Sequence, residues 1–457
     1  MCTRRVCDRL LGTHTWPPGV SQTSHEEADA IVVNTCAFVD DAKAESISAI
    51  LDAAGYKKAG SAKRVVVTGC LAQRYAADLA QELPEVDLVV GFQEYPKLSA
   101  ELHSALGPQR PRAAGEQLAG GAAAGGPAAG AKVLVGDATV PFRAEWDRVA
   151  LTPRHSAYLR VAEGCDHKCT FCAIPSFRGR FRSKPWDAVL DEARRLAAGG
   201  VKELNLIAED TNQYGQDFPK GDPRRLSHLL GALSEVEGIH WIRILYAYPS
   251  YFTDDLIDAI ATLPKVCKYI DIPLQHIANT QLLAMNRPPR QHTEALLNTL
   301  RARIPGLALR TTFICGFPGE RQEDHDQLVA FCRDFQFERL GAFAFSQEEG
   351  TPAGTYPEQL DLAVREARRD ELVSQQQRIC ERVAQARVGS EVDVLVDAID
   401  EEGVFVGRTQ LEAPDVDPVV FLHDAGLPGV EPLAVGQMRR CKVVGASMFD
   451  LTAHPVA

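Results

Sequence analysis

The sequence lacks any run of about 18 uninterrupted apolar residues, the length that a membrane-spanning helix needs, so we expect no membrane span. It also lacks an excess of positive charge, because 49 lysines and arginines stand against 61 aspartates and glutamates and the net charge is −12. The chain as a whole is therefore unsuited to gripping a phosphate backbone, although a local basic patch remains open. A signal peptide is also missing from the first residues.

The composition that is present is typical of a globular protein with an ample core, because 45% of the residues are hydrophobic and 24% are charged. A length of 457 residues predicts about three domains. The chain has twelve cysteines, several of them in metal-like spacing, which indicates a reducing compartment. We expect the cytoplasm, with an organelle stroma as the alternative.

One short loop carries three thiols, Cys165, Cys169 and Cys172, in a C-x3-C-x2-C spacing. A [4Fe-4S] cluster normally takes four thiolates, so three would leave one iron open for a substrate or cofactor. The alternative is a structural zinc site, which usually adds a distant second Cys/His pair. His167 lies inside the loop and has no partner motif nearby. Ligand softness and spacing therefore favour the cluster.

Two further cysteines each follow an apolar segment in the first hundred residues. Residues 28–36 read ADAIVVNTC and residues 63–70 read KRVVVTGC, and helical segments alternate with these strands. This alternation predicts an open α/β domain with a parallel sheet, where ligands collect beyond the carboxyl ends of the strands. Cys36 and Cys70 would then lie on one side of the domain. The alternative, two buried structural cysteines, remains open.

A Gly/Ala/Pro-rich tract at 107–131 has almost nothing to bury, and we interpret it as a flexible insertion without chemistry. A β/α rhythm then begins near residue 157 and predicts a partial TIM-like barrel whose cysteine loop follows the first strand, on the face where barrel active sites lie. A charged helix is expected over 361–387, and short alternating strands from Gly389 predict a small antiparallel β-barrel. The six strands of the partial barrel are expected at 158–161, 203–209, 241–248, 269–274, 309–316 and 340–345.

Polar groups follow several of these strands, at 209–215, 275–276 and 316–320, and together they indicate a lined cavity. Each segment alone is a weak signal, since Gly-Phe-Pro-Gly is more often a turn than a cofactor site. A basic run follows the cysteine loop, and it is either a solvated loop or a surface that recognises an acidic macromolecular substrate. The members of this run are Arg178, Arg180, Arg182 and Lys184.

The cysteine loop, with Phe171 directly before its last cysteine, resembles the radical S-adenosylmethionine (radical SAM) superfamily. The continuation AIP at 173–175, RGR at 178–180 and RS at 182–183 is similar to its methylthiotransferase branch. The resemblance implies that Cys165, Cys169 and Cys172 hold a [4Fe-4S] cluster, which cleaves S-adenosylmethionine to a 5′-deoxyadenosyl radical. It also implies that residues around the cavity help to hold S-adenosylmethionine. These residues are Phe171, Glu209, Gln275, Gly316, Gly319 and Glu320.

The segments around Cys36 and Cys70 resemble the amino-terminal domain of that branch, where three cysteines hold a second [4Fe-4S] cluster that supplies sulfur. The first cysteine of the branch belongs to a Cys-Pro-Lys-Asn motif, which this sequence lacks. Residues 9–12 are similar to the helix that follows that motif, so we expect a start cut short, with the missing ligand at or before Met1. Neither Cys2 nor Cys7 has the right context.

The last 70 residues resemble the TRAM domain, which engages RNA or protein, through GRT, APDVD and DLTA. Segments 247–260, 269–288 and 345–353 are similar to the RimO-like branch, which modifies an aspartate of protein twelve of the small ribosomal subunit. The implied partners are that ribosomal protein, a reductant protein and RNA at the TRAM domain. A tRNA adenosine methylthiotransferase is the alternative.

A protein of another class, a non-catalytic iron-sulfur carrier or an RNA-binding protein, is the second alternative. A carrier would normally close the coordination of its cluster, which the three-cysteine loop does not do. The expected domains are 1–106 (methylthiotransferase domain), 107–150 (insertion and linker), 151–387 (radical SAM core) and 388–457 (TRAM domain).

Overall fold

A computed structural model describes residues 24–25, 28–60, 62–106, 131–140, 142, 152–423 and 431–456. The predicted linker at 107–131 therefore lies outside the described residues up to residue 130, as do Cys2 and Cys7. The chain folds into two compact units. The first unit holds the residues up to 151 together with 173–180, and the second holds 152–172 and 181–457.

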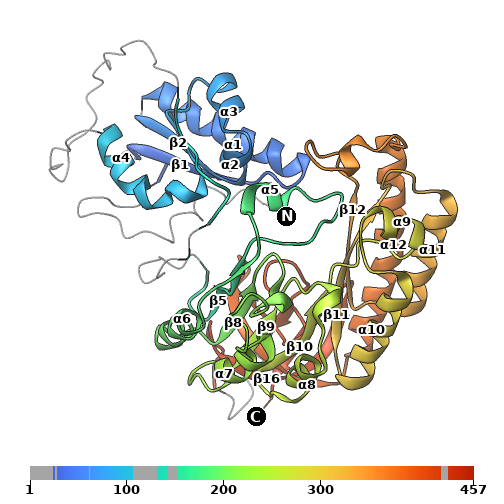
Figure 1. The fold of residues 1–457 in the computed structure, drawn as a ribbon. Helices are drawn as coiled ribbons and strands as arrows, with labels where there is room; N and C mark the ends of the chain where they lie inside the picture. Colours follow the sequence, from blue (N-terminus) through green and yellow to red (C-terminus); the bar gives the residue numbers. More distant parts are fainter. Residues whose placement is uncertain are drawn as a thin grey trace. The chain divides into compact units, whose positions relative to one another are not determined.

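The first unit is a parallel sheet of four strands in the order β1-β2-β3-β4, with helices on it (Figure 1). Its central strands are apolar and buried, as expected for a parallel sheet that is covered on both faces. The strands are β1 (Ala30–Thr35), β2 (Arg64–Gly69), β3 (Leu88–Val90) and β4 (Lys132–Leu134). The helices are α1 (Asp40–Ala59), α2 (Cys70–Arg74), α3 (Ala76–Glu82), α4 (Leu98–Leu106) and α5 (Ile174–Arg178), with a 3-10 helix at Phe92–Lys97.

The strand β4 differs from our expectation, because it lies inside the segment 107–150 that we interpreted as insertion and linker. Its three residues pair in parallel with β3, from Lys132 opposite Leu88 to Leu134 opposite Val90. The strand is only three residues long and partly exposed, so it has no apolar run to reveal it in the sequence. This part of the segment completes the sheet.

The second unit begins with six parallel strands in the order β12-β11-β10-β9-β8-β5, which form the predicted partial barrel (Figure 1). All six predicted strands are present. They are β5 (Ser156–Arg160), β8 (Glu203–Ile207), β9 (Trp241–Ile244), β10 (Val266–Asp271), β11 (Ala308–Cys315) and β12 (Arg339–Ala344). The helices between them are α6 (Trp186–Ala198), α7 (Leu226–Ser234), α8 (Asp254–Thr262), α9 (Asn279–Ala284), α10 (Arg290–Arg303) and α11 (Gln322–Phe335). A short hairpin, β6 (Ala162–Glu163) with β7 (Arg182–Ser183), frames the cysteine loop.

Alternation along β11 shows how the strands divide their side chains. Leu309, Phe313 and Cys315 point to one face and lie in the large core between the sheet and the helices. Arg310 and Thr312 point to the other face and are only half-buried. The barrel therefore presents polar side chains on the face turned away from the helices.

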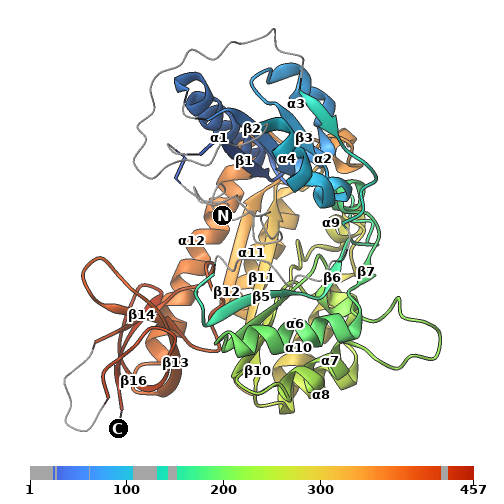
Figure 2. The same ribbon diagram turned by 90° about the vertical axis from the view of Figure 1, so that its left-hand side faces the viewer.

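A long helix, α12 (Leu362–Ala386), follows β12 and continues to a small closed barrel (Figure 2). The barrel strands are β13 (Glu391–Ile399), β14 (Phe405–Arg408), β15 (Val420–Leu422), β16 (Met438–Ser447) and β17 (Asp450–Pro455). We expected antiparallel strands throughout, but β15 pairs with β17 in parallel. None of the described helices is long and apolar enough to cross a membrane.

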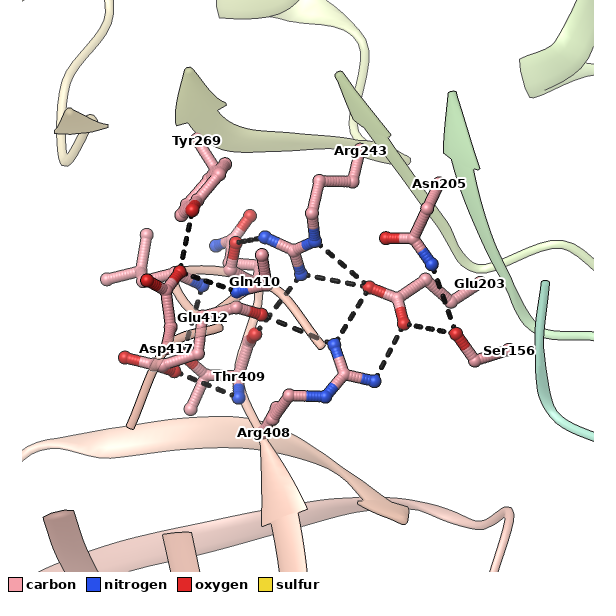
Figure 3. Close-up of polar contacts among 12 residues, drawn as sticks. Ser156, Glu203, Asn205, Arg243, Tyr269, Arg408, Thr409, Gln410, Glu412 and Asp417 are labelled. Carbon is pink, nitrogen blue, oxygen red and sulfur yellow. Dashed lines mark hydrogen bonds and ion pairs between the residues drawn. The ribbon is translucent and has the colours of Figure 1, made fainter. Parts of the chain in front are cut away.

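A buried ionic cluster joins this small barrel to the large sheet within the second unit (Figure 3). The Glu203 carboxylate accepts hydrogen bonds from Arg243 Nη2 at 3.0 Å and from Arg408 Nη2 at 2.8 Å, and all three side chains are buried. Burial disfavours the charged carboxylate, but the two guanidinium groups outweigh it and lower the pKa of Glu203 to about 2. Tyr269 donates to Asp417 at 2.6 Å, which gives a second bond across the same junction.

Candidate functional site

The cysteine loop leaves the barrel at the carboxyl end of β5, as the sequence predicts for an active-site loop. Gly164 turns the chain with φ of 77°, a conformation that glycine adopts without strain. Its N–H donates to Glu209 Oε2 at 3.0 Å, so a side chain from the end of β8 fixes the start of the loop. Cys165, Cys169 and Cys172 follow, all partly exposed.

Residues at the end of α9 hold the middle of the loop from across the barrel. Asn286 Nδ2 donates to Lys168 O at 3.0 Å. Thr170 N donates to Met285 O at 3.2 Å, and Thr170 Oγ1 donates to Ala284 O at 2.8 Å. These three hydrogen bonds fix the backbone on both sides of Cys169.

A stack of three side chains lies against the same cysteine. The His167 ring is parallel to the Tyr248 ring, with centroids 3.5 Å apart and an angle of 12°. The Arg287 guanidinium carbon lies 4.1 Å from the centre of the Tyr248 ring, and Nη1 lies 3.8 Å from Cys169 Sγ. His167 Nε2 also lies 2.7 Å from Asp210 Oδ2. Burial raises the pKa of Tyr248 to about 12, and a hydrogen bond to Cys169 acts in the same direction.

The chemistry of the loop fits a group that binds thiolates. No disulfide joins any of the cysteines in the described ranges. Burial raises the pKa of Cys165 to about 12, which favours its thiol form in the protein alone. The loop therefore offers three sulfur ligands that are partly exposed and in no disulfide, a donor set that fits an iron-sulfur cluster.

The predicted residues for S-adenosylmethionine lie in the second unit, on the loops that follow β5, β8, β10 and β11. Phe171 packs against a small cluster of buried side chains, among them Met285, Phe317 and Phe345. Gln275 is buried with φ of 72°, and its Oε1 has no hydrogen-bond partner within the described part of the chain. That oxygen is an acceptor still available to a ligand.

The turn at 316–320 is held by its own glutamate. Glu320 Oε2 accepts hydrogen bonds from Gly316 N at 2.6 Å and Phe317 N at 3.2 Å, and Oε1 accepts one from Arg368 at 3.0 Å. Burial raises the pKa of Glu320 to about 7, even though Arg368 opposes the shift. Gly316 has φ of 74°, and a Cβ there would lie 2.5 Å from Arg365 Cγ, so only glycine fits. The turn thus has a structural reason for its residues, whatever it binds.

The two early cysteines lie in the first unit, at the ends of neighbouring strands. Cys36 follows β1 and Cys70 follows β2, and the last residues of these strands, Thr35 and Gly69, are paired. Cys36 N donates to Ser46 Oγ at 2.9 Å, which ties the strand end to α1. The topology therefore brings both thiols to the carboxyl edge of one sheet.

The members of the basic run belong to both compact units and differ in their burial. Arg178 belongs to the first unit, where Nη2 lies 3.6 Å from Cys70 Sγ and the guanidinium covers the Phe92 ring at 4.5 Å. Lys184 is only 2% exposed and is paired with Glu192, so for this residue both the solvated loop and the recognition surface are wrong. Arg182 is half-buried and Arg180 is exposed.

Sequence reasoning assigned no role to Arg287 or Tyr248, although both lie in segments that carried the family resemblance. The only signal was their position in the sequence, because Tyr248 follows β9 and Arg287 follows α9 by a few residues. The contact with Cys169 depends on the positions of three separate segments, and no local pattern encodes that.

Comparison with known proteins identifies the class. The radical SAM superfamily model matches residues 159–332, the model of uncharacterized protein family UPF0004 matches residues 14–91, and the TRAM domain model matches residues 388–456. The chain is thus a radical SAM enzyme with a TRAM domain at its carboxyl end. Among solved structures, the radical SAM methyltransferase TsrM from Kitasatospora setae is 16% identical and covers 72% of this chain and 66% of its own, with a TM-score of 0.48, which carries no conclusion about function.

Curated relatives narrow the class to a family. Ribosomal protein uS12 methylthiotransferase RimO of Symbiobacterium thermophilum is 43% identical over 93% of this chain and 83% of its own length. The proteins of the same name from Geobacter sulfurreducens and Anaeromyxobacter are 42% and 41% identical, over 95% and 98% of this chain and 92% and 89% of their own lengths. The chain belongs to the RimO family of methylthiotransferases.

Proposed function

We propose that this protein adds a methylthio group to the β-carbon of an aspartate in ribosomal protein uS12. The observation that carries the proposal is the three-thiol loop at the carboxyl end of the barrel strands, in a chain that aligns with RimO proteins over nearly its full length. A [4Fe-4S] cluster held in this loop would supply a binding position for S-adenosylmethionine and the electron for its cleavage. The residues that would hold this cluster are Cys165, Cys169 and Cys172.

The chain itself supplies position and surroundings. Glu209 and the end of α9 fix the cysteine loop. The unpartnered Gln275 Oε1 is the strongest candidate contact for S-adenosylmethionine among the predicted residues, with Phe171, Gly316, Gly319 and Glu320 shaping the loops around it. Cys36 and Cys70 would provide two ligands of a second [4Fe-4S] cluster that donates sulfur. A reductant protein would supply the electrons for the reaction.

The charge of the TRAM region favours a basic protein over RNA as its partner. Residues 388–457 contain twelve acidic and four basic side chains, a net charge of −8. One of the four basic residues, Arg408, is buried in the junction with the barrel. An RNA backbone would be repelled by this balance, whereas a basic ribosomal protein would be attracted. We therefore rank the tRNA adenosine and RNA-binding alternatives below the ribosomal protein.

The test is an anaerobic assay with reconstituted enzyme, dithionite, S-adenosylmethionine and purified uS12. We expect 5′-deoxyadenosine as a product and, by mass spectrometry, a methylthio adduct on one aspartate. If 5′-deoxyadenosine forms but the methylthio group is found on a tRNA adenosine and not on uS12, the substrate is tRNA and the proposed substrate is wrong. The absence of both iron and 5′-deoxyadenosine would overturn the radical mechanism itself.

A further inference from the structure

The guanidinium group of Arg287 has an unusual set of partners. Nη1 lies 3.8 Å from Cys169 Sγ, Nη2 donates to Pro273 O, and the plane covers the Tyr248 ring at 4.1 Å. Its Nε is buried and has no hydrogen-bond partner within the described ranges. A sulfur, a carbonyl oxygen and an aromatic face thus surround a permanent positive charge.

No ion pair joins Arg287 to a carboxylate within the described part of the chain. Asp210 lies close to the same stack of rings, but its partner there is His167, at 2.7 Å. Arginines of the second unit elsewhere show the usual arrangement, as when Arg310 bonds to Asp271 at 2.9 Å. Of the partners of Arg287 within the described residues, Cys169 is the one that carries a negative charge as a cluster ligand.

The backbone on both sides of Cys169 is held without the Arg287 side chain. Thr170 donates hydrogen bonds to the carbonyl oxygens of Ala284 and Met285, and Asn286 donates one to the carbonyl oxygen of Lys168. The side chain of Arg287 can therefore be changed without releasing the loop. This separates its electrostatic effect from the anchoring of the ligand.

We propose that Arg287 is a positioning residue that orients the Cys169 sulfur and makes a cluster held by Cys165, Cys169 and Cys172 easier to reduce. This rests on the proposed function, which places a [4Fe-4S] cluster on those three cysteines. Reduction adds one electron, and hence one negative charge, to the cluster. A guanidinium that hydrogen-bonds to a ligand sulfur stabilises the more negative state, and so it raises the reduction potential.

The test compares full-length variants in a Cys36→Ala/Cys70→Ala background, so that the iron content and the EPR signal come from the three-cysteine cluster alone. The variants are Arg287→Met and Arg287→Gln, which remove the charge, and Arg287→Lys, which keeps it. The matched control is Arg290→Met, because Arg290 lies three residues along the chain and pairs with Glu294 on the surface of α10. Each protein is reconstituted anaerobically with iron and sulfide and titrated with dithionite, followed by the EPR signal of the reduced cluster.

We expect Arg287→Met and Arg287→Gln to bind as much iron as the parent and to be at least tenfold harder to reduce, a fall of about 59 mV in midpoint potential for one electron. The midpoint potential of Arg287→Lys should lie between those of the neutral variants and the parent. The midpoint potential of Arg290→Met should equal that of the parent. A neutral variant with parental iron content and parental potential would overturn the proposal. If both neutral variants lose iron, the proposal is overturned, because Arg287 then acts on cluster binding rather than on the reduction potential. A parent that binds no iron would instead defeat the proposed function.

Discussion

At the scale of single residues, the two sets of cysteines differ in the work we assign to them. Cys169 lies in the barrel loop that would hold the cluster for radical formation, whereas Cys36 lies in the first unit. We expect Cys169→Ala to abolish 5′-deoxyadenosine formation because it removes a cluster ligand. Cys36→Ala should leave this cleavage intact and stop methylthio transfer, which product analysis by mass spectrometry will show. Full transfer by Cys36→Ala would contradict the role of the second cluster.

Arg178 contacts Cys70 much as Arg287 contacts Cys169, because Arg178 Nη2 lies 3.6 Å from Cys70 Sγ. We expect Arg178→Ala to lower the iron bound by the first unit, because the side chain that contacts the Cys70 sulfur is removed. Iron and sulfide are measured in a Cys165→Ala/Cys169→Ala/Cys172→Ala background. Arg180→Ala is the control, since its side chain is exposed. An equal loss of iron in both variants would assign the effect to the loop rather than to the guanidinium.

At the scale of secondary-structure elements, β8, β9 and β14 are joined by the buried carboxylate of Glu203. Its lowered pKa, about 2 against an ordinary value near 4.5, stabilises the fold above about pH 4.5, and that stability is lost as the pH falls toward 2. We expect Glu203→Gln to unfold more easily at neutral pH, by about 3–5 kcal/mol, because two buried arginines lose their partner. The difference from the parent should shrink on acidification, as measured by urea unfolding at a series of pH values. A difference that does not change with pH would show that the carboxylate charge is not responsible.

The same elements show what sequence can predict and what it cannot. The six barrel strands could be placed from the β/α rhythm of the sequence, in which short strand-like segments alternate with helical ones. The thiol spacing could be read directly, since the three ligands lie within one loop. The burial of Lys184 against Glu192 could not, because a lysine in a basic run has no local mark of burial. The short strand β4 and the parallel pair β15–β17 were missed because their pairing is decided by tertiary packing.

At the scale of the whole molecule, negative charge is concentrated at the carboxyl end, where 388–457 carry −8 of the total −12. The turn between β13 and β14 presents two exposed members of this set, Glu401 and Glu402. Charges at the rim of an interface act mainly through long-range attraction, which salt screens. The TRAM region should therefore draw in uS12 in a salt-dependent manner.

We expect Glu401→Gln/Glu402→Gln to raise the KM for uS12 roughly fivefold at low salt, because exposed pairs contribute about 0.2–1 kcal/mol each. The kcat should not change, since neither residue approaches the cysteine loop in the chain's second unit. The dependence of KM on salt should also become shallower than in the parent. Glu235→Gln/Glu237→Gln, an exposed pair after α7, is the matched control and should leave both quantities at parental values. If the two pairs have equal effects on KM, the attraction depends on the net charge of the protein and not on the TRAM surface. If neither pair changes KM, charge does not contribute to the choice of substrate.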